Sequence, residues 1–126
     1  MATVMVVDDT QIIRETVAKL LRHEGYQTVC ASNGREALAE FRKMAPDLVL
    51  LDIMMPDMNG MEFLEQLRQD PGGRNLPVIM MSALGDDANQ NLARELGASD
   101  FLVKTRFNAS QVLERVKHWI KQPADN

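Results

Sequence analysis

Acidic side chains come directly after two of the most apolar stretches of the chain. Asp8 and Asp9 follow the first such stretch, and Asp52 ends a continuous apolar run in the middle of the chain. Ser82 and Lys104 follow two later apolar stretches in the same way. Carboxylates held close together repel one another unless a cation lies among them, and their hard oxygens suit Mg²⁺ or Mn²⁺ better than zinc. If the fold brings them together, these residues predict a divalent metal site with a hydroxyl and an ammonium beside it.

The same residues could accept a phosphoryl group and bind its oxygens. A carboxylate is a plausible nucleophile toward phosphorus, and we assign this role to Asp52. The hydroxyl of Ser82 and the ammonium of Lys104 would bind the oxygens of the transferred group. Each residue also has a plain structural interpretation when taken alone: the acids and Ser82 as turn or helix caps, and Lys104 as a solvated surface charge. Their joint occurrence at four predicted strand ends favours the functional interpretation.

Five short apolar stretches alternate with segments of helical spacing, and each stretch has the length of a strand. The expected strands are residues 3–7, 26–31, 48–52, 78–81 and 101–103. After each of them, apolar residues recur at the spacing of an amphipathic helix. The expected apolar faces include Ile12, Met44, Leu92 and Trp119. The first helix has Asp9 or Thr10 as its cap, and the last has Asn108 or Ser110.

This repeating pattern predicts an α/β fold in which a five-stranded parallel sheet carries five helices on its two faces, doubly wound in the flavodoxin-like manner. Periodicity alone does not give the order of the strands. The common five-strand order is 2-1-3-4-5, which places the first and third strands side by side. In that order, the acids after the first strand would lie beside Asp52, at the carboxyl edge where such sheets bind ligands.

The 126 residues fit one globular domain, which we place at residues 1–121, followed by a polar tail or the start of a linker at residues 122–126. A net charge of −4 without a basic run gives direct nucleic-acid binding no electrostatic support. No segment approaches the ~18 apolar residues of a membrane span, and no signal peptide is recognisable, so no membrane partner and a cytoplasmic location are expected. The lone cysteine, Cys30, is expected to be a small buried side chain.

Taken together, these motifs resemble the receiver domain of two-component response regulators, in particular single-domain chemotaxis receivers. The resemblance runs from Val4 to about Ile120 and rests on Val6-Val7-Asp8-Asp9, Leu50-Leu51-Asp52-Ile53-Met54-Met55-Pro56 with Gly60, Val78-Ile79-Met80-Met81-Ser82-Ala83, Gly97-Ala98 and Lys104. It implies a switch protein and not an enzyme. A histidine kinase or a histidine phosphotransfer protein would phosphorylate Asp52, with Mg²⁺ required.

The resemblance also implies which groups would bind the metal. Asp9, Asp52 and the backbone carbonyl of Met54 would bind it directly, and Asp8 would act through a water molecule. Phosphotransfer would be catalysed by the domain itself, and autodephosphorylation would be slow.

Two further residues are implied to carry the signal onward. Ser82 would move to hydrogen-bond the phosphoryl group, while Lys104 pairs with another of its oxygens. Phe101 occupies the family's aromatic switch position and would rotate inward as Ser82 moves. The surface formed by the last two helices and the fifth strand would then change for a downstream effector protein.

Two departures from the family pattern lie close to the expected phosphoryl group. The family usually has proline after its lysine, whereas Thr105 stands here and the next aromatic residue, Phe107, comes one place later. A cis bond before Thr105 would cost about 2.5–4 kcal/mol, so we expect a trans link with a rearranged loop or a strained bond held by its neighbours. Met54 and Leu84 are apolar where many relatives are polar, which predicts a longer-lived phosphoaspartate.

Two other functions fit parts of the pattern. A pseudo-receiver, an interaction domain that has lost phosphorylation, would explain the unusual segment after Lys104 but not the intact acids. A hydrolase that passes through phosphoaspartate, as haloacid-dehalogenase-like phosphatases do, would have a second acid two residues after the nucleophile, where this chain has Met54. We therefore favour the phosphorylation switch.

Overall fold

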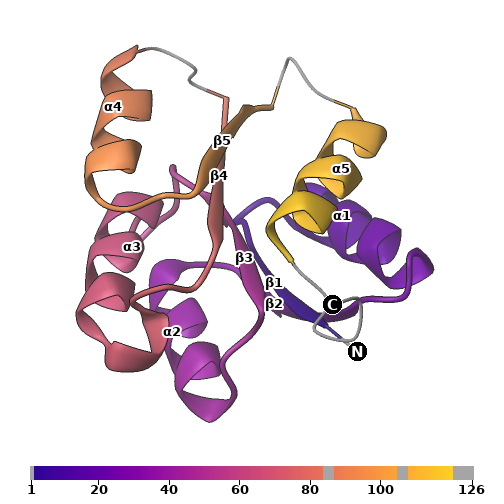
Figure 1. Cartoon of the computed structure of the whole chain (residues 1–126), viewed down its shortest axis with the longest axis horizontal. Helices are drawn as coiled ribbons and strands as arrows, with labels where there is room; N and C mark the ends of the chain where they lie inside the picture. The colour runs from indigo at the N-terminus through magenta and orange to yellow at the C-terminus, as the bar shows by residue number, and fades with distance from the viewer. Residues whose placement is uncertain (1, 84–86, 105–107, 121–126) are drawn as a thin grey trace.

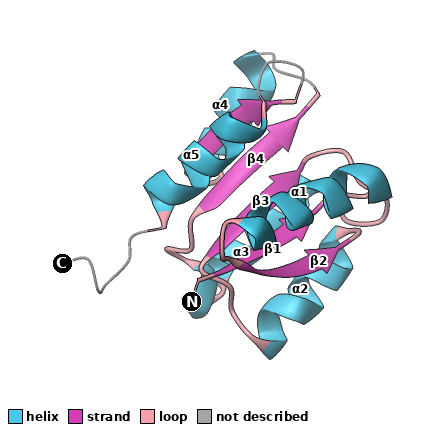
Figure 2. Ribbon diagram, turned by 90° about the vertical axis from the view of Figure 1, so that its right-hand side faces the viewer, coloured by secondary structure: helices cyan, strands magenta, loops and turns pink. Residues whose placement is uncertain are grey.

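The structure is a computed structural model that describes residues 2–83, 87–104 and 108–120. Within these residues, five parallel strands form one sheet in the order β2-β1-β3-β4-β5 (Figure 1, Figure 2). The strands are β1 (Thr3–Val7), β2 (Gln27–Ala31), β3 (Leu48–Asp52), β4 (Val78–Ser82) and β5 (Asp100–Val103). Each strand begins within one residue of its predicted start, and the predicted sheet type and strand order are confirmed.

Across the described ranges, five α-helices cover the two faces of this sheet, as the α/β pattern predicts. They are α1 (Gln11–His23), α2 (Gly34–Lys43), α3 (Gly60–Gln69), α4 (Asp87–Glu95) and α5 (Ala109–Trp119). Helices α1 and α5 lie on one face, and α2, α3 and α4 lie on the other (Figure 1). A short 3₁₀ helix, Pro71–Gly73, follows α3. In the part that the structure describes, no helix is long and apolar enough to cross a membrane.

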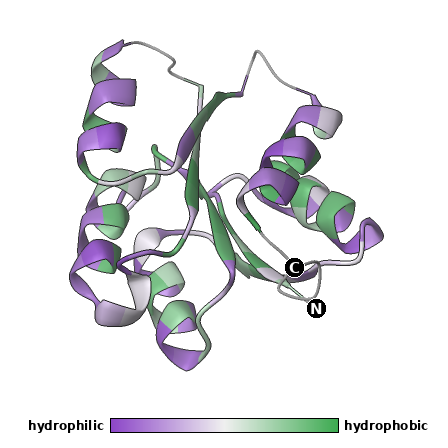
Figure 3. Ribbon diagram, in the orientation of Figure 1, coloured by the Kyte–Doolittle hydropathy of each residue, from purple (hydrophilic) through white to green (hydrophobic). Residues whose placement is uncertain are grey.

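The apolar core forms two layers because both faces of the sheet are covered. Successive side chains of a strand point to opposite faces, so each strand contributes to both layers. In β3, Leu48 and Leu50 belong to the layer under α1 and α5, whereas Val49 and Leu51 belong to the other. All of β3 is buried, which explains its unbroken apolar sequence. Figure 3 shows hydrophobic strands lying between helices with hydrophilic outer faces.

Three apolar side chains that helical spacing placed on core faces are exposed, so this part of the prediction is wrong. Ile12 is 77% exposed, Met44 65% and Leu92 43%. Ile12 and Leu92 each precede a residue that packs toward the core, Ile13 and Ala93, and successive helical side chains point about 100° apart. Met44 follows the last residue of α2 with an extended backbone, so it leaves the helix face.

Two other expectations about burial have opposite outcomes. Trp119 is partly buried against the core layer under α1 and α5, as predicted. Cys30 is exposed, so the expectation of a buried thiol is wrong. It lies in β2, which pairs with β1 alone and forms an edge of the sheet, and edge strands are covered less completely than central ones.

Side chains close in sequence define where several helices begin. Asn59 caps α3: its side chain accepts a hydrogen bond from the Glu62 N–H, and the Glu62 carboxylate accepts one from the Asn59 N–H. Asn108 caps α5 with the same kind of reciprocal bonding, so Asn108 and not Ser110 is the cap. The cap residue of α1 is Thr10, whose side chain makes no capping hydrogen bond.

Asp100 ties β5 to α5. Its carboxylate accepts hydrogen bonds from Arg115 Nη1 at 2.7 and 2.8 Å and from Trp119 Nε1 at 2.9 Å. Burial alone would raise the pKa of Asp100, but these bonds, one from the Phe101 backbone N–H and the charge of Arg115 lower it below its ordinary value. A carboxyl with a lowered pKa stabilises the fold above its unfolded-state pKa, and this contribution is lost as the pH falls through its folded-state pKa.

Arg115→Met is therefore expected to lower the free energy of unfolding at pH 7. We expect a loss of only about 1 kcal/mol, because the Arg115 side chain is 42% exposed and solvent screens the pair. The loss should be smaller near pH 3, and urea unfolding at the two pH values measures both. Lys117→Met removes a looser pair with Glu24, at 3.6 Å, from the same helix and should change little. Equal losses from Arg115→Met at both pH values would contradict the ion-pair explanation.

Candidate functional site

The predicted site residues meet at the carboxyl edge of the sheet. The register of β1 and β3 places Asp8 beside Asp52, and Asp9 follows at the start of the next loop. Ser82 ends β4, where it pairs with the residue that precedes Lys104 in β5. Four strands therefore deliver these side chains to one place, as the 2-1-3-4-5 order predicts.

Asp8, Asp9 and Asp52 form an acidic cluster in which one carboxylate oxygen of each lies within 4.8 Å of the others. Asp8 and Asp52 are buried, whereas Asp9 is exposed, so the cluster is reached from solvent on the side of Asp9. Carboxylate oxygens suit a hard divalent cation such as Mg²⁺, which keeps several of its water molecules when it binds. The donor set fits the metal that the sequence predicts.

Lys104 lies against two of these acids. Its Nζ is 2.7 Å from Asp8 Oδ2 and 3.2 Å from Asp52 Oδ1. Burial acts to lower the pKa of Lys104, but hydrogen bonds to the two acids and their negative charges outweigh it and raise the pKa. The ammonium is therefore charged at neutral pH. The backbone N–H of Lys104 donates to the Ser82 carbonyl at 2.7 Å, which holds Lys104 against the end of β4.

The surroundings of Asp52 raise its pKa from an ordinary 3.8 to about 6. Burial is the main cause, the charge of Asp8 adds to it, and Lys104 acts in the opposite direction. At pH 7 the carboxylate is still mostly ionised, as a nucleophile requires. A bound divalent cation would favour the ionised form further.

The loop that joins β3 to α3 is held at both ends. The Gly60 N–H donates to the Ile53 carbonyl at 2.9 Å. The Met58 carbonyl accepts a hydrogen bond from the Gly34 N–H at the start of α2, at 3.1 Å. Between these contacts, Asp57 adopts a left-handed backbone with φ of 64°, a conformation that Asp tolerates better than most residues. These contacts hold in place the loop whose backbone is expected to reach the metal.

The side chain that caps α3 is that of Asn59 and not that of Asp52. Asp52 instead points its carboxylate at Lys104. Met54, which belongs to the loop between β3 and α3, is 61% exposed.

The two predicted switch residues lie on neighbouring strands. Ser82 is fully buried at the end of β4, and Phe101 in β5 is partly buried against the core layer under α2, α3 and α4. Their proposed movement stays a prediction. The expectations about the link after Lys104 concern residues 105–107, which lie outside the described residues, as does Leu84.

Two contacts that hold Asp8 were missed from the sequence. Its Oδ1 accepts a hydrogen bond from the Thr10 N–H at 2.9 Å, and its backbone carbonyl accepts one from Arg14 Nη1 at 2.8 Å. The first is a local turn in which an Asp side chain bonds the backbone two residues on, a pattern that the sequence could have indicated. Arg14 gave no such signal, because an arginine on the polar side of a helix is ordinary.

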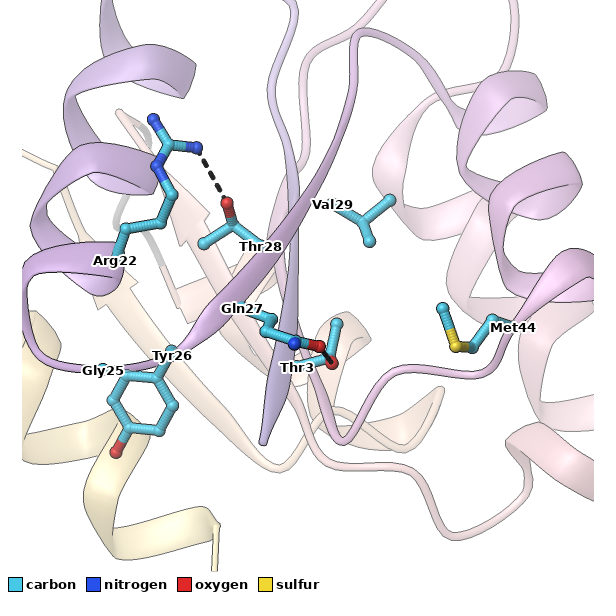
Figure 4. A pocket seen from close by; sticks show the side chains of 8 residues that line it. All are labelled: Thr3, Arg22, Gly25, Tyr26, Gln27, Thr28, Val29 and Met44. Atoms are coloured by element: carbon cyan, nitrogen blue, oxygen red, sulfur yellow. Dashed lines mark hydrogen bonds between the residues drawn. The ribbon is translucent and has the colours of Figure 1, made fainter. Parts of the chain in front are cut away.

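A separate open hollow lies beside the edge strand β2 (Figure 4). Its lining residues are Thr3, Arg22, Gly25, Tyr26, Gln27, Thr28, Val29 and Met44. Within it, Arg22 Nη1 donates to Thr28 Oγ1 at 2.9 Å. Thr3 begins β1 whereas the acids follow its end, so this hollow lies at the other end of the strands from the acidic cluster.

Comparison with known proteins agrees with this arrangement. The family model described as "Response regulator receiver domain" matches residues 4–117. The chain belongs to this family. Receiver domains are the phosphoacceptor switches of two-component signalling, so the resemblance read from the sequence is confirmed.

Similar proteins match nearly the whole of this receiver domain. The sensory transduction protein RegX3 of Mycolicibacterium smegmatis is 35% identical over 126 residues, which are 100% of this chain and 54% of RegX3. The DNA-binding response regulator MtrA of Mycobacterium tuberculosis is 36% identical over 122 residues, 97% of this chain and 52% of MtrA. The receiver domain thus spans about half the length of these relatives. The structure of the chemotaxis protein CheY4 of Vibrio cholerae matches with a TM-score of 0.89 and 33% identity, covering 94% of this chain and 98% of that chain.

Proposed function

We propose that this receiver domain accepts a phosphoryl group on Asp52 from a phosphohistidine of a histidine kinase or a histidine phosphotransfer protein. One observation carries the proposal: the Lys104 ammonium lies 3.2 Å from Asp52 Oδ1, inside a cluster of three carboxylates at the carboxyl edge of the sheet. A nucleophile, a cation for the phosphoryl oxygens and a set of metal ligands are thus within reach of one another.

In this reaction an Asp52 carboxylate oxygen forms a bond to phosphorus while the bond from phosphorus to the histidine nitrogen breaks. The ionised carboxylate is the nucleophile, and a pKa of about 6 leaves it mostly ionised at pH 7. Lys104 already lies beside Asp52, so its ammonium can pair with an oxygen of the incoming phosphoryl group after a small movement. Bound Mg²⁺ or Mn²⁺ would supply positive charge for the other phosphoryl oxygens.

We assign the metal ligands from the same geometry and the family resemblance. Asp9, Asp52 and the Met54 backbone carbonyl bind the metal directly, and Asp8 binds through a water molecule. Asp8 suits the indirect role because its Oδ2 is already hydrogen-bonded to Lys104 at 2.7 Å and its Oδ1 to the Thr10 N–H at 2.9 Å.

We further propose that phosphorylation is read out through Ser82 and Phe101 at the surface of α4, β5 and α5. The buried Ser82 hydroxyl turns toward the phosphoryl group, and Phe101 follows it inward. An effector protein then binds the altered surface. The domain, residues 1–121, makes no direct contact with nucleic acid in this proposal. Residues 122–126, expected from the sequence to be a polar tail or the start of a linker, lie outside the described residues. DNA binding, which the name of MtrA states for that relative, would then come from another part of a longer protein. A cytoplasmic location belongs to the same proposal.

An intact-mass measurement with a small phosphodonor tests the proposal. The domain is incubated with acetyl phosphate and Mg²⁺, and a gain of one phosphoryl group is expected for the wild type but not for Asp52→Asn. Glu65→Gln, which changes an exposed acid on α3, is the matched control and should be phosphorylated normally. No mass gain in the wild type, or an equal gain in Asp52→Asn, would contradict Asp52 as the acceptor and favour a pseudo-receiver. Continuous turnover of a small phosphate ester would favour a hydrolase.

The phosphoaspartate is expected to be long-lived, because the apolar Met54 and Leu84 give an attacking water little help. Met54→Asn and Leu84→Glu should therefore speed hydrolysis of the phosphorylated domain. The amide can hydrogen-bond an attacking water, and the carboxylate can also accept its proton as a general base, so we expect an increase of about tenfold or more. Loss of the added mass over time, after removal of acetyl phosphate, measures the rates. Unchanged rates in both variants would count against this explanation.

A further inference from the structure

Arg14 makes a contact with the site that neither the phosphoacceptor nor the metal ligands explain. It lies in the first part of α1, and its Nη1 donates to the backbone carbonyl of Asp8 at 2.8 Å. That carbonyl belongs to the peptide bond that joins Asp8 to Asp9. Because a peptide unit is planar, holding the carbonyl oxygen also sets the direction in which the following residue leaves.

The other polar groups of Asp8 are held as well. Its N–H donates to the Ala31 carbonyl at 3.1 Å, and its carboxylate is bonded by the Thr10 N–H and by Lys104. Asp9 is exposed, so its position depends more on the backbone that precedes it than on packing of its own side chain. The Arg14 contact therefore acts on the least buried of the three acids in the cluster.

Arg14 could affect a metal in two opposite ways. Its positive charge lies near the acidic cluster and would repel a divalent cation. Its hydrogen bond would instead favour the cation by keeping the two neighbouring carboxylates in place. The two effects change the affinity for Mg²⁺ in opposite directions, so variants of Arg14 distinguish them.

We infer that Arg14 is a positioning residue of the metal site, which holds the Asp8–Asp9 peptide so that both carboxylates face the cation. The inference rests on the proposed function, since it assumes that the acidic cluster binds Mg²⁺. Arg14 does not touch the metal or the phosphoryl group. Its effect passes through the backbone, like that of the residues that orient metal ligands in other proteins.

Calorimetric titration of the unphosphorylated domain with Mg²⁺ tests the inference without any phosphodonor. Arg14→Met keeps the length of the side chain but removes both the donor and the charge, and we expect the dissociation constant to rise about tenfold. If Arg14 acted through charge alone, the same variant would bind Mg²⁺ more tightly than the wild type. Tighter or unchanged binding would therefore overturn the inference.

Two more variants sharpen this test. Arg14→Lys keeps the charge but loses the planar guanidinium, so weaker binding is expected again, whereas an effect of charge alone predicts no change. It also serves if Arg14→Met does not fold. Arg22→Met changes the arginine of the hollow in Figure 4, on the same helix, and should bind Mg²⁺ as the wild type does. Absence of Mg²⁺ binding in the wild type would refute the metal site itself, while normal wild-type binding with unchanged Arg14 variants would refute only the role of Arg14.

Discussion

Asp52→Asn is expected to stabilise the metal-free domain at pH 8, although it removes the residue at the centre of the site. The surroundings of Asp52 raise its pKa from 3.8 to about 6, mainly through burial and then through the charge of Asp8. Ionised Asp52 is therefore less favourable in the folded state than in the unfolded chain. A pKa difference of about two units between the folded and unfolded states lowers the free energy of unfolding by about 3 kcal/mol. Asparagine has no charge and avoids this loss.

The pH dependence of this stabilisation has a definite sign. Because the folded-state pKa of Asp52 is raised, the folded chain holds its proton more tightly than the unfolded chain does. Below pH 4 the carboxyl is protonated in both states and the charge costs nothing. The cost grows between pH 4 and pH 6 and is fully present above that range. Urea unfolding of both proteins in EDTA should therefore show the advantage of Asp52→Asn appearing across this pH range.

Addition of Mg²⁺ should reduce the difference in stability between Asp52→Asn and the wild type. A cation that binds the folded wild type stabilises it by mass action, and Asp52→Asn lacks one of the carboxylate ligands. The advantage of the variant at pH 8 should shrink as Mg²⁺ is added. Glu65→Gln, on the exposed side of α3, controls for the general effect of removing one negative charge and should change stability little. A variant that is less stable than the wild type in EDTA at pH 8 would contradict the cost assigned to the buried carboxylate.

Gly60→Ala is expected to lower the free energy of unfolding by about 1–3 kcal/mol, because the new methyl group would collide with backbone. It would overlap the carbonyl oxygen of Asp52 and lie 3.0 Å from the Asp52 carbonyl carbon and from Ile53 Cα. None of these atoms can rotate away as a flexible side chain could. The gain of up to about 1 kcal/mol that alanine usually brings to a helix is too small to cancel this collision.

The same substitution should also weaken phosphorylation, since the shift needed to relieve the collision moves the backbone of Asp52 and Ile53. Urea unfolding and the rate of mass gain with acetyl phosphate measure the two effects. Gly72→Ala is the matched control, because the nearest atoms to its methyl group are Asp70 Oδ1 at 3.4 Å and Phe41 Cζ at 3.7 Å, which is ordinary contact. A Gly60→Ala domain as stable and as readily phosphorylated as the wild type would show that the loop can move freely.

Much of this fold could be predicted from the sequence because its determinants are local. The unbroken apolar run of residues 48–51 marks a strand covered on both faces, and β3 is buried along its whole length. Asn108 before the last amphipathic stretch indicates a helix start, and it caps α5. The acids, hydroxyl and lysine at the ends of strands pointed to one site, and the strand order brings Asp8 beside Asp52.

The spacing of apolar residues was less informative about which side chains are exposed, because exposure depends on how the other elements of the fold cover them. Ile12 and Leu92 fit a helical apolar spacing, yet both face outward because a neighbouring residue in each helix takes the place toward the core. Cys30 lies in β2, and its exposure follows from the position of β2 at the edge of the sheet, which the strand order decides.

By itself, the sequence predicted the residues that we propose carry the chemistry, and the strand ends at which the structure places them. Only the tertiary structure decided how they are held: Lys104 bonds to Asp8 across 96 positions of sequence, and Arg14 reaches the carbonyl beside it. Gly60 approaches the backbone of Asp52 too closely for any side chain. These contacts join parts of the chain that the sheet brings together. The spacing of residues along the chain therefore does not predict them. The tertiary structure also buries Asp52 and places the charges of Asp8 and Lys104 beside it, and these together give Asp52 a pKa of about 6.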